Sequence, residues 1–73
     1  MAKVLLFGQL ADIAGWRERS IEAPTVAALK AQLAELDLDA PGIHVAVDLA
    51  IVRGDVALCA ANEVAFLPPM SGG

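Results

Sequence analysis

Apolar residues in the first half of the chain follow two different patterns. Residues 3–7 form a short run of mostly bulky apolar residues bounded by Gly8, which predicts a strand buried on both faces. Between residues 26 and 36, valine and leucine recur at the three- and four-residue spacing of one helical face, which predicts a helix. Thr25 is the expected N-cap, because its hydroxyl can accept a hydrogen bond from a free backbone N–H of the first turn.

Two shorter elements are expected between this strand and this helix. Residues 10–14 predict a single helical turn that ends at Gly15, a residue type that readily adopts the left-handed conformation of a helix C-terminus. Residues 17–22 are more polar and predict a strand at a sheet edge, where charged side chains discourage aggregation.

The second half of the chain is expected to be rich in strands. Large apolar residues alternate with other residues over 43–48, which indicates a strand, and residues 49–52 are a weaker candidate. Residues 63–67 predict the last strand. It ends at Pro68 and Pro69, because proline has no N–H to donate to a sheet ladder.

This order of elements is typical of an α+β fold with one main helix across one face of a mixed sheet of four to five strands. Seventy-three residues supply apolar material for a single core. We therefore expect one domain over residues 1–67, followed by an extended and flexible C-terminal functional tail over residues 68–73.

Composition and charge narrow the classes of partner. Apolar residues make up 58% of the chain, and a domain this small cannot bury them all, so an exposed apolar patch that binds a partner is expected. The net charge is −4 and the five basic residues are scattered, which argues against nucleic acid and anionic membranes as partners. With one cysteine and no apolar run of signal-peptide or membrane-spanning length, a cytoplasmic location is expected.

The inventory of reactive residues excludes most catalytic sites. One histidine and one cysteine cannot build a structural zinc site, and the acidic residues show no metal-ligand spacing. No glycine-rich loop is present that would cradle a phosphate group. We therefore expect no metal, no bound cofactor and no catalysis by this chain alone.

The individual candidates for chemistry have simpler interpretations. Cys59 stands among alanine and leucine residues, which predicts a buried and inert thiol. His44 is expected to point away from the core, either to solvent or to an interface. Trp16 is interpreted as a partly buried anchor, with partner contact as the alternative, and Lys3 and Lys30 as solvated charges.

The ending Pro68-Pro69-Met70-Ser71-Gly72-Gly73 carries the strongest functional indication. The prolines stiffen the exit from the sheet, and the four residues after them can reach about 13–14 Å further. The two glycines lack a Cβ atom, so their backbone fits a channel too narrow for side chains. We expect the carboxylate of Gly73 to be the working group once a partner has activated it, for example as an anhydride with AMP. A frayed and inert end is the alternative.

A family resemblance runs along nearly the whole chain. Its most specific part is the Pro-Pro-x-Ser/Thr-Gly-Gly ending, because thiazole-pathway sulfur carriers share the terminal glycines but usually not the prolines. On these residues the chain resembles the small, sulfur-carrying subunit of molybdopterin synthase, the MoaD family of ubiquitin-like β-grasp proteins. The segments that carry the resemblance are residues 3–8, 10–15, 24–29, 45–47 and 63–73.

The resemblance implies a cycle of sulfur transfer. An E1-like adenylating enzyme would activate Gly73 with ATP, and a sulfur donor protein would convert it to a thiocarboxylate. The thiocarboxylate would give its sulfur to cyclic pyranopterin monophosphate to form the molybdopterin dithiolene, within a heterotetramer of two small and two large subunits. The positions expected at the interface with the large subunit are Phe66, Pro68, Pro69, Met70, Ser71 and Gly72.

Two segments depart from the family pattern. Residues 60–63 are Ala-Ala-Asn-Glu where an Asp-Gly-Asp-Glu type of turn is usual, and Asp48 stands where asparagine is common. These departures concern the local loop geometry and the details of partner choice, and they leave the chemistry of the tail intact. Another sulfur-carrier or modifier pathway (thiazole synthesis, tRNA thiolation or lysine conjugation) is the alternative function. A binding module with an inert tail is a further one.

Overall fold

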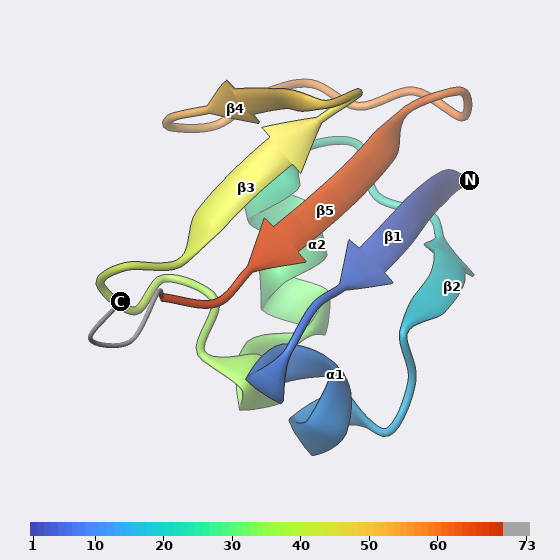
Figure 1. Ribbon diagram of the computed structural model, residues 1–73. Coiled ribbons are helices and arrows are strands. Elements are labelled where there is room, and N and C mark those ends of the chain that lie inside the picture. Colours follow the sequence, from blue (N-terminus) through green and yellow to red (C-terminus); the bar gives the residue numbers. More distant parts are fainter. Residues whose placement is uncertain (70–73) are drawn as a thin grey trace.

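The computed structural model describes residues 1–69 and contains a five-stranded sheet with helices packed on one side (Figure 1). The strand order is β2-β1-β5-β3-β4, in which β1 and β5 are parallel and the other neighbours antiparallel. The mixed sheet and the α+β class expected from the sequence are confirmed. The elements are β1 (Ala2–Leu6), α1 (Gln9–Ala14), β2 (Glu18–Ile21), α2 (Val26–Gln32), the 3₁₀ helix η1 (Ala34–Leu36), β3 (His44–Val47), β4 (Ala50–Val52) and β5 (Glu63–Leu67).

The core lies between α2 and one face of the sheet. Figure 1 shows α2 behind the sheet, crossing β3 and β5. Apolar side chains from the helix and from the inner face of the strands form one buried cluster, which removes them from water and stabilises the fold. The largest side chains that are fully buried are Phe66, Leu29, Val4, Val26 and Val64.

The predicted helix over residues 26–36 forms in two pieces. Helix α2 ends at Gln32, and η1 continues the chain after Leu33 to Leu36, so the apolar stripe stays buried although the helix changes geometry. The expected N-cap is confirmed, because the Thr25 hydroxyl accepts a hydrogen bond from the Ala28 N–H at 3.1 Å. Within residues 1–69, no helix combines the length and apolar character that a membrane crossing needs.

The expectation that the strand over residues 3–7 is buried on both faces is wrong. Along β1, Ala2, Val4 and Leu6 are buried, whereas Lys3 is exposed and Leu5 is half-buried. The reason is that α2 covers one face of the sheet only, so alternate residues of a strand meet different surroundings. An apolar residue on the open side of β1 therefore remains in reach of solvent.

A tight turn joins β3 to β4, the weaker of the predicted strands. Asp48 and Leu49 have φ angles of 50° and 72°, a pair of left-handed residues that suits a two-residue hairpin turn. Residues 17–22 contribute β2, which lies at the sheet edge as expected. The short helical turn also forms, and α1 ends at Gly15, where φ is 83°.

Candidate functional site

The site begins where β5 leaves the sheet. The strand ends at Leu67, and Pro68 and Pro69 continue outward, the first half-buried and the second exposed. The Phe7 N–H donates a hydrogen bond to the Phe66 carbonyl oxygen at 3.3 Å, which ties the end of β1 to the end of β5. Met70, Ser71, Gly72 and Gly73 lie outside the described residues, so the expectations for them stay predictions.

The register of the strands places one set of side chains on the face that α2 leaves open. Leu5 pairs with Ala65, Ala65 with Ala46, and Ala46 with Ile51, so these residues form a row across four strands. Residues paired directly across a ladder share a face, and residues two apart along a strand do so as well. We call the face carrying Leu5, Ala46, Ile51, Ala65 and Leu67 the open sheet face.

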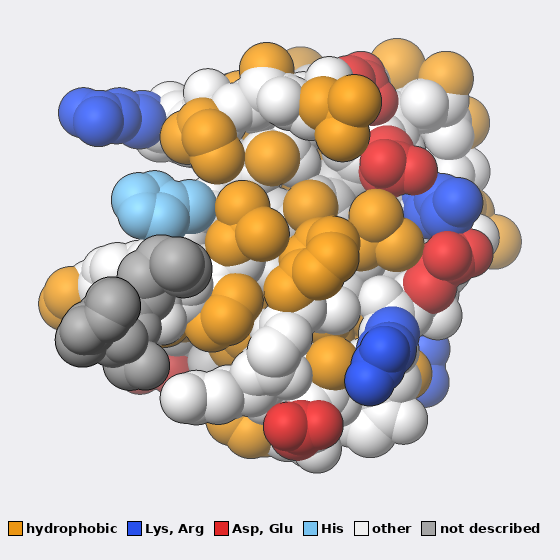
Figure 2. All heavy atoms as spheres, in the orientation of Figure 1, with side chains coloured by type: hydrophobic (Ala, Val, Ile, Leu, Met, Phe, Trp, Pro, Cys, Tyr) orange, Lys and Arg blue, Asp and Glu red, His pale blue; other side chains and the backbone are white. Residues whose placement is uncertain are grey.

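The middle of the open sheet face is apolar. Figure 2 views the molecule from this side and shows hydrophobic side chains gathered over the centre of the sheet, with charged side chains around them. Ile51 is 56% exposed, and Leu5, Ala65 and Leu67 are half-buried. His44 pairs with Leu67 and is exposed on the same face, in agreement with its expected position. An exposed apolar face with a polar border is typical of a protein-binding surface.

Charged residues occupy one end of the open sheet face. The Lys3 ammonium group lies 3.7 Å from a Glu18 carboxylate oxygen and 3.8 Å from one of Glu63. Lys3 is thus exposed to solvent, as expected from the sequence, and also lies near two carboxylates. The three charges come from neighbouring strands β2, β1 and β5. Lys3 pairs directly with Glu63, and Glu18 pairs with Leu5, two residues further along β1 and on the same face.

The two segments that depart from the family pattern contact each other. The Asp48 carboxylate accepts one hydrogen bond from the Asn62 side-chain amide at 2.7 Å and another from the Glu63 N–H at 2.9 Å. These bonds link the β3–β4 turn to the start of β5, next to the charged end of the open sheet face. The two departures are thus parts of one local arrangement.

The expectation of a buried Cys59 is wrong, because this residue is exposed. It lies in the loop before β5, where Leu58 packs against the core and the next side chain turns outward. Its N–H donates to the Asn62 side-chain oxygen at 2.7 Å, and its thiol lies 3.4 Å from the same oxygen. An apolar stretch in a surface loop does not bury every residue. Trp16, by contrast, is partly buried against the core as expected.

Phe66 also requires a correction. It was expected at the partner interface, but its side chain is 0% exposed and lies in the core on the helix side of β5. Its neighbours Ala65 and Leu67 take the open side of that strand. Sequence reasoning missed them, together with Leu5 and Ile51. The available indication was the alternation along β5, whose odd-numbered positions must lie opposite Val64 and Phe66.

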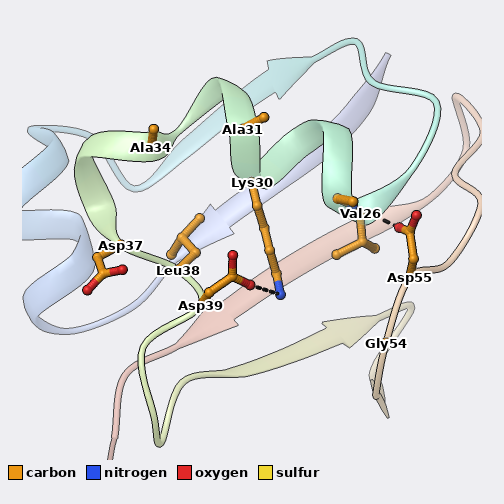
Figure 3. Close-up of a pocket in the computed structure, with 10 residues that line it drawn as sticks. Val26, Lys30, Ala31, Ala34, Asp37, Leu38, Asp39, Gly54 and Asp55 are labelled. Carbon is orange, nitrogen blue, oxygen red and sulfur yellow. Dashed lines mark hydrogen bonds and ion pairs between the residues drawn. The ribbon is translucent and has the colours of Figure 1, made fainter.

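A cavity of about 450 Å³ lies on the helix side of the molecule, between α2 and the loops that follow η1 and β4. In Figure 3, Lys30 and Asp39 point toward each other, and their nearest atoms are 2.9 Å apart. Lys30 is therefore ion-paired rather than a solvated charge. Asp55, on the same cavity, accepts a hydrogen bond from the Ala27 N–H at 2.8 Å and so helps Thr25 to cap α2.

The described residues offer binding contacts and a defined exit for the tail. Among residues 1–69, no three histidine, cysteine or acidic side chains gather where they could hold a metal ion. Within the same range, no charged or polar residue is buried. A feature of this part of the chain that can bind a partner is the open sheet face, which borders the point where β5 ends and Pro68 begins.

Comparison with known proteins places this geometry in a family. The ThiS family model matches residues 4–73. The molybdopterin synthase sulfur carrier subunit of Escherichia coli (strain K12) is 36% identical over 81 residues, an alignment that covers all of both chains.

Two solved structures share the fold. SAMP1 from Haloferax volcanii superposes with a TM-score of 0.79 at 26% identity, covering 99% of this chain and 98% of that one. The small archaeal modifier protein 1 (SAMP1) from Methanosarcina acetivorans gives a TM-score of 0.81 at 22% identity, covering 99% of this chain and 95% of that one. The ubiquitin-like β-grasp fold expected from the resemblance is confirmed, and the chain belongs to the ThiS family.

Proposed function

We propose that this chain is the sulfur-carrying small subunit of a molybdopterin synthase, and that it carries sulfur as a thiocarboxylate on Gly73. The observation that supports this most directly is the position of β5. This strand is central in the sheet and delivers Pro68 and Pro69 outward at the border of the open sheet face. The full-length match to the E. coli sulfur carrier subunit supports the same assignment.

The proposed chemistry takes place at the carboxyl group of Gly73. A carboxylate oxygen attacks the α-phosphorus of ATP on an E1-like adenylating enzyme, which forms the acyl-adenylate and releases pyrophosphate. A sulfur donor protein supplies the equivalent of hydrosulfide, which forms the carbon–sulfur bond and expels AMP. The resulting thiocarboxylate transfers its sulfur to cyclic pyranopterin monophosphate and, with an oxygen from water, Gly73 returns to a carboxylate. Catalytic groups are supplied by the partners.

The open sheet face is the proposed contact with the large subunit of the synthase. Its apolar centre gives binding free energy when water is removed from it, and the surrounding charges set orientation. Because this face borders the exit of β5, a partner bound there also has the tail within reach. Two small and two large subunits would form the complete heterotetramer.

The direct test is intact-protein mass spectrometry after incubation with an E1-like adenylating enzyme, ATP and a sulfide source. We expect a mass gain equal to the exchange of one oxygen for sulfur. Deletion of Gly73 should abolish this gain without lowering the melting temperature, because the residue lies beyond the last strand. An unchanged mass for the wild-type chain in the presence of an active enzyme would contradict the proposal.

A second candidate function is attachment to other proteins through the same carboxyl group. The SAMP1 structure from H. volcanii favours it, because that protein is named a small archaeal modifier protein and shares the fold at 26% identity. The acyl-adenylate would then react with a lysine amine of a target protein instead of with sulfur, and AMP would leave in both cases.

Affinity purification from the native cell separates the two functions. The first predicts a non-covalent complex with a molybdopterin synthase large subunit that dissociates in denaturant. The second predicts denaturant-resistant conjugates in which a lysine of the target carries a Gly-Gly remnant after suitable proteolysis. Conjugates without any large subunit in the purified material would favour the modifier.

A further inference from the structure

The topology places two loops on either side of the point where β5 leaves the sheet. Strand β1 runs parallel to β5, so the loop after β1 lies at the C-terminal end of β5. Strand β3 runs antiparallel to β5, so the loop before β3 lies at that same end. Figure 1 shows β5 leaving the sheet between the end of β1 and the start of β3.

Each of these loops contributes a glycine that lies against one proline. A Cβ atom added to Gly8 would come 3.0 Å from Pro68 Cγ, and one added to Gly42 would come 2.7 Å from Pro69 Cβ. Real Cβ atoms essentially never approach another atom as closely as 2.7 Å, and a distance of 3.0 Å is tighter than nearly all real contacts. A side chain at either glycine would therefore crowd the neighbouring proline ring, most severely at Gly42. We refer to Gly8 and Gly42 as the loop glycines.

Backbone strain alone does not explain these two glycines. All four glycines in the described part of the chain have positive φ, from 54° at Gly8 to 90° at Gly42. At Gly15 and Gly54, however, an added Cβ atom would have nothing within 4 Å. The loop glycines thus combine a left-handed backbone with close contact to a proline, and the other two have the backbone conformation alone.

The loops that carry them are held by backbone hydrogen bonds. The Leu10 N–H donates to the Phe7 carbonyl oxygen at 3.2 Å on one side of the exit, and the Ile43 N–H donates to the Ala40 carbonyl oxygen at 3.3 Å on the other. The prolines therefore meet two fixed surfaces. Pro69 is confined further, because its own ring restricts φ.

We infer that Gly8 and Gly42 are positioning residues that set the direction in which the tail leaves the domain, and that this direction controls the chemical step at Gly73. The inference rests on the proposed function. Gly73 can lie up to about 13–14 Å beyond Pro69, so a change of direction at the prolines shifts the region that the carboxyl group can reach. Attack on ATP requires the carboxylate oxygen to be close to the α-phosphorus and in line with it, so a shifted region lowers the fraction of bound molecules that react.

The test measures ATP-dependent thiocarboxylate formation by full-length variants, using an E1-like adenylating enzyme that loads the wild-type chain, with sodium sulfide as the sulfur source. Gly42→Ala is compared with Gly54→Ala, which has the same kind of backbone strain but no close neighbour. For Gly42→Ala we expect kcat to fall by at least about tenfold while KM stays within about twofold, since the folded surfaces of the domain that the enzyme can contact are unchanged. Gly54→Ala should keep both constants within about twofold of the wild type.

Two further variants keep the test decisive if Gly42→Ala does not fold. Pro69→Gly changes an exposed residue outside the sheet, so the domain should fold, and freeing the tail should lower kcat by about tenfold without changing KM. Gly8→Ala should have a smaller effect, because the Pro68 ring can shift at its Cγ atom. The inference would be overturned if kcat were unchanged in both Gly42→Ala and Pro69→Gly. It would also be overturned if Gly42→Ala and Gly54→Ala lost kcat equally. Failure of the wild-type chain to load would instead overturn the proposed function.

Discussion

The two faces of the sheet use the same strands for different purposes. On the covered face, Val4, Val64 and Phe66 are each 0% exposed and pack beneath α2. On the open face, Leu5 and Ala65 come from the same two strands, alternate with those residues, and remain half-buried. The apolar character of the two sets is similar. What differs is whether this chain supplies the layer that covers them.

This comparison shows that residues that stabilise the fold and residues available for partner binding are adjacent along each strand. Successive side chains of a strand point to opposite faces, so a substitution at Val64 acts on the core, whereas one at Ala65 acts on the surface. The covered face should determine the free energy of unfolding, and the open face should determine affinity. Substitutions on each face can therefore test the two roles independently.

The largest effect on stability is expected for Leu29→Ala on the covered side. Leu29 is fully buried between α2 and the sheet, so its truncation removes apolar contacts and leaves a cavity. We expect the free energy of unfolding to fall by about 2–5 kcal/mol, measured by urea denaturation. A loss below about 1 kcal/mol would show that the core does not depend on this contact.

On the open side, Ile51→Ser should weaken binding to the proposed large subunit by about tenfold, because the most exposed large apolar side chain of the open sheet face is lost. Stability should change by less than about 1 kcal/mol, since the side chain is already more than half exposed. The matched control is Ile13→Ser, which removes an isoleucine of similar exposure from α1. Affinities are measured by calorimetry. Equal losses of affinity in the two variants would contradict the proposal that the open sheet face binds the large subunit.

A substitution at the N-cap of α2 tests whether a loss of stability on the helix side leaves partner binding unchanged. Thr25→Ala removes the hydroxyl that accepts from the Ala28 N–H and should cost about 1 kcal/mol of unfolding free energy. Affinity for the large subunit should not change, because α2 lies on the opposite side of the sheet. Thermal unfolding and calorimetry on the same sample measure both quantities. A parallel loss of affinity would mean that the two faces are coupled.

The smallest effect is expected at the charged end of the open face. Lys3→Met removes the cation that lies near Glu18 and Glu63, and all three side chains are substantially exposed. We expect a loss of less than about 1 kcal/mol that shrinks further as salt concentration rises. Urea denaturation at low and high ionic strength measures this difference. A larger loss at high salt would be inconsistent with screened ion pairs.

Local features of the sequence were sufficient to predict most elements. Three local signals predicted the helices: the apolar spacing from Val26 to Leu36, the hydroxyl of Thr25 and the glycine at position 15. Each acts through residues close to it in the sequence, so its effect depends little on the rest of the fold. The family ending likewise identified the chain as a relative of sulfur carriers, because that motif is contiguous. The open sheet face was anticipated only as an unspecified apolar patch.

Features that depend on distant parts of the chain could not be predicted in the same way. Residues 3–7 carry large apolar side chains on both faces of the strand, so no local pattern says which face the helix will cover. Phe66 was expected at the interface because of the family resemblance, whereas the strand register places it in the core. The contact between Gly42 and Pro69 joins positions far apart in sequence, and only the strand order brings them together.

The central position of β5 has a mechanical consequence. A partner that grips the tail pulls along the axis of a strand that is hydrogen-bonded on both sides, to β1 and to β3. The load then falls on both ladders at once, in shear, and many hydrogen bonds share it before any of them breaks. An edge strand pulled sideways would instead peel away one bond at a time. Under the proposed function, this arrangement keeps the domain folded while a partner pulls on its C-terminal end.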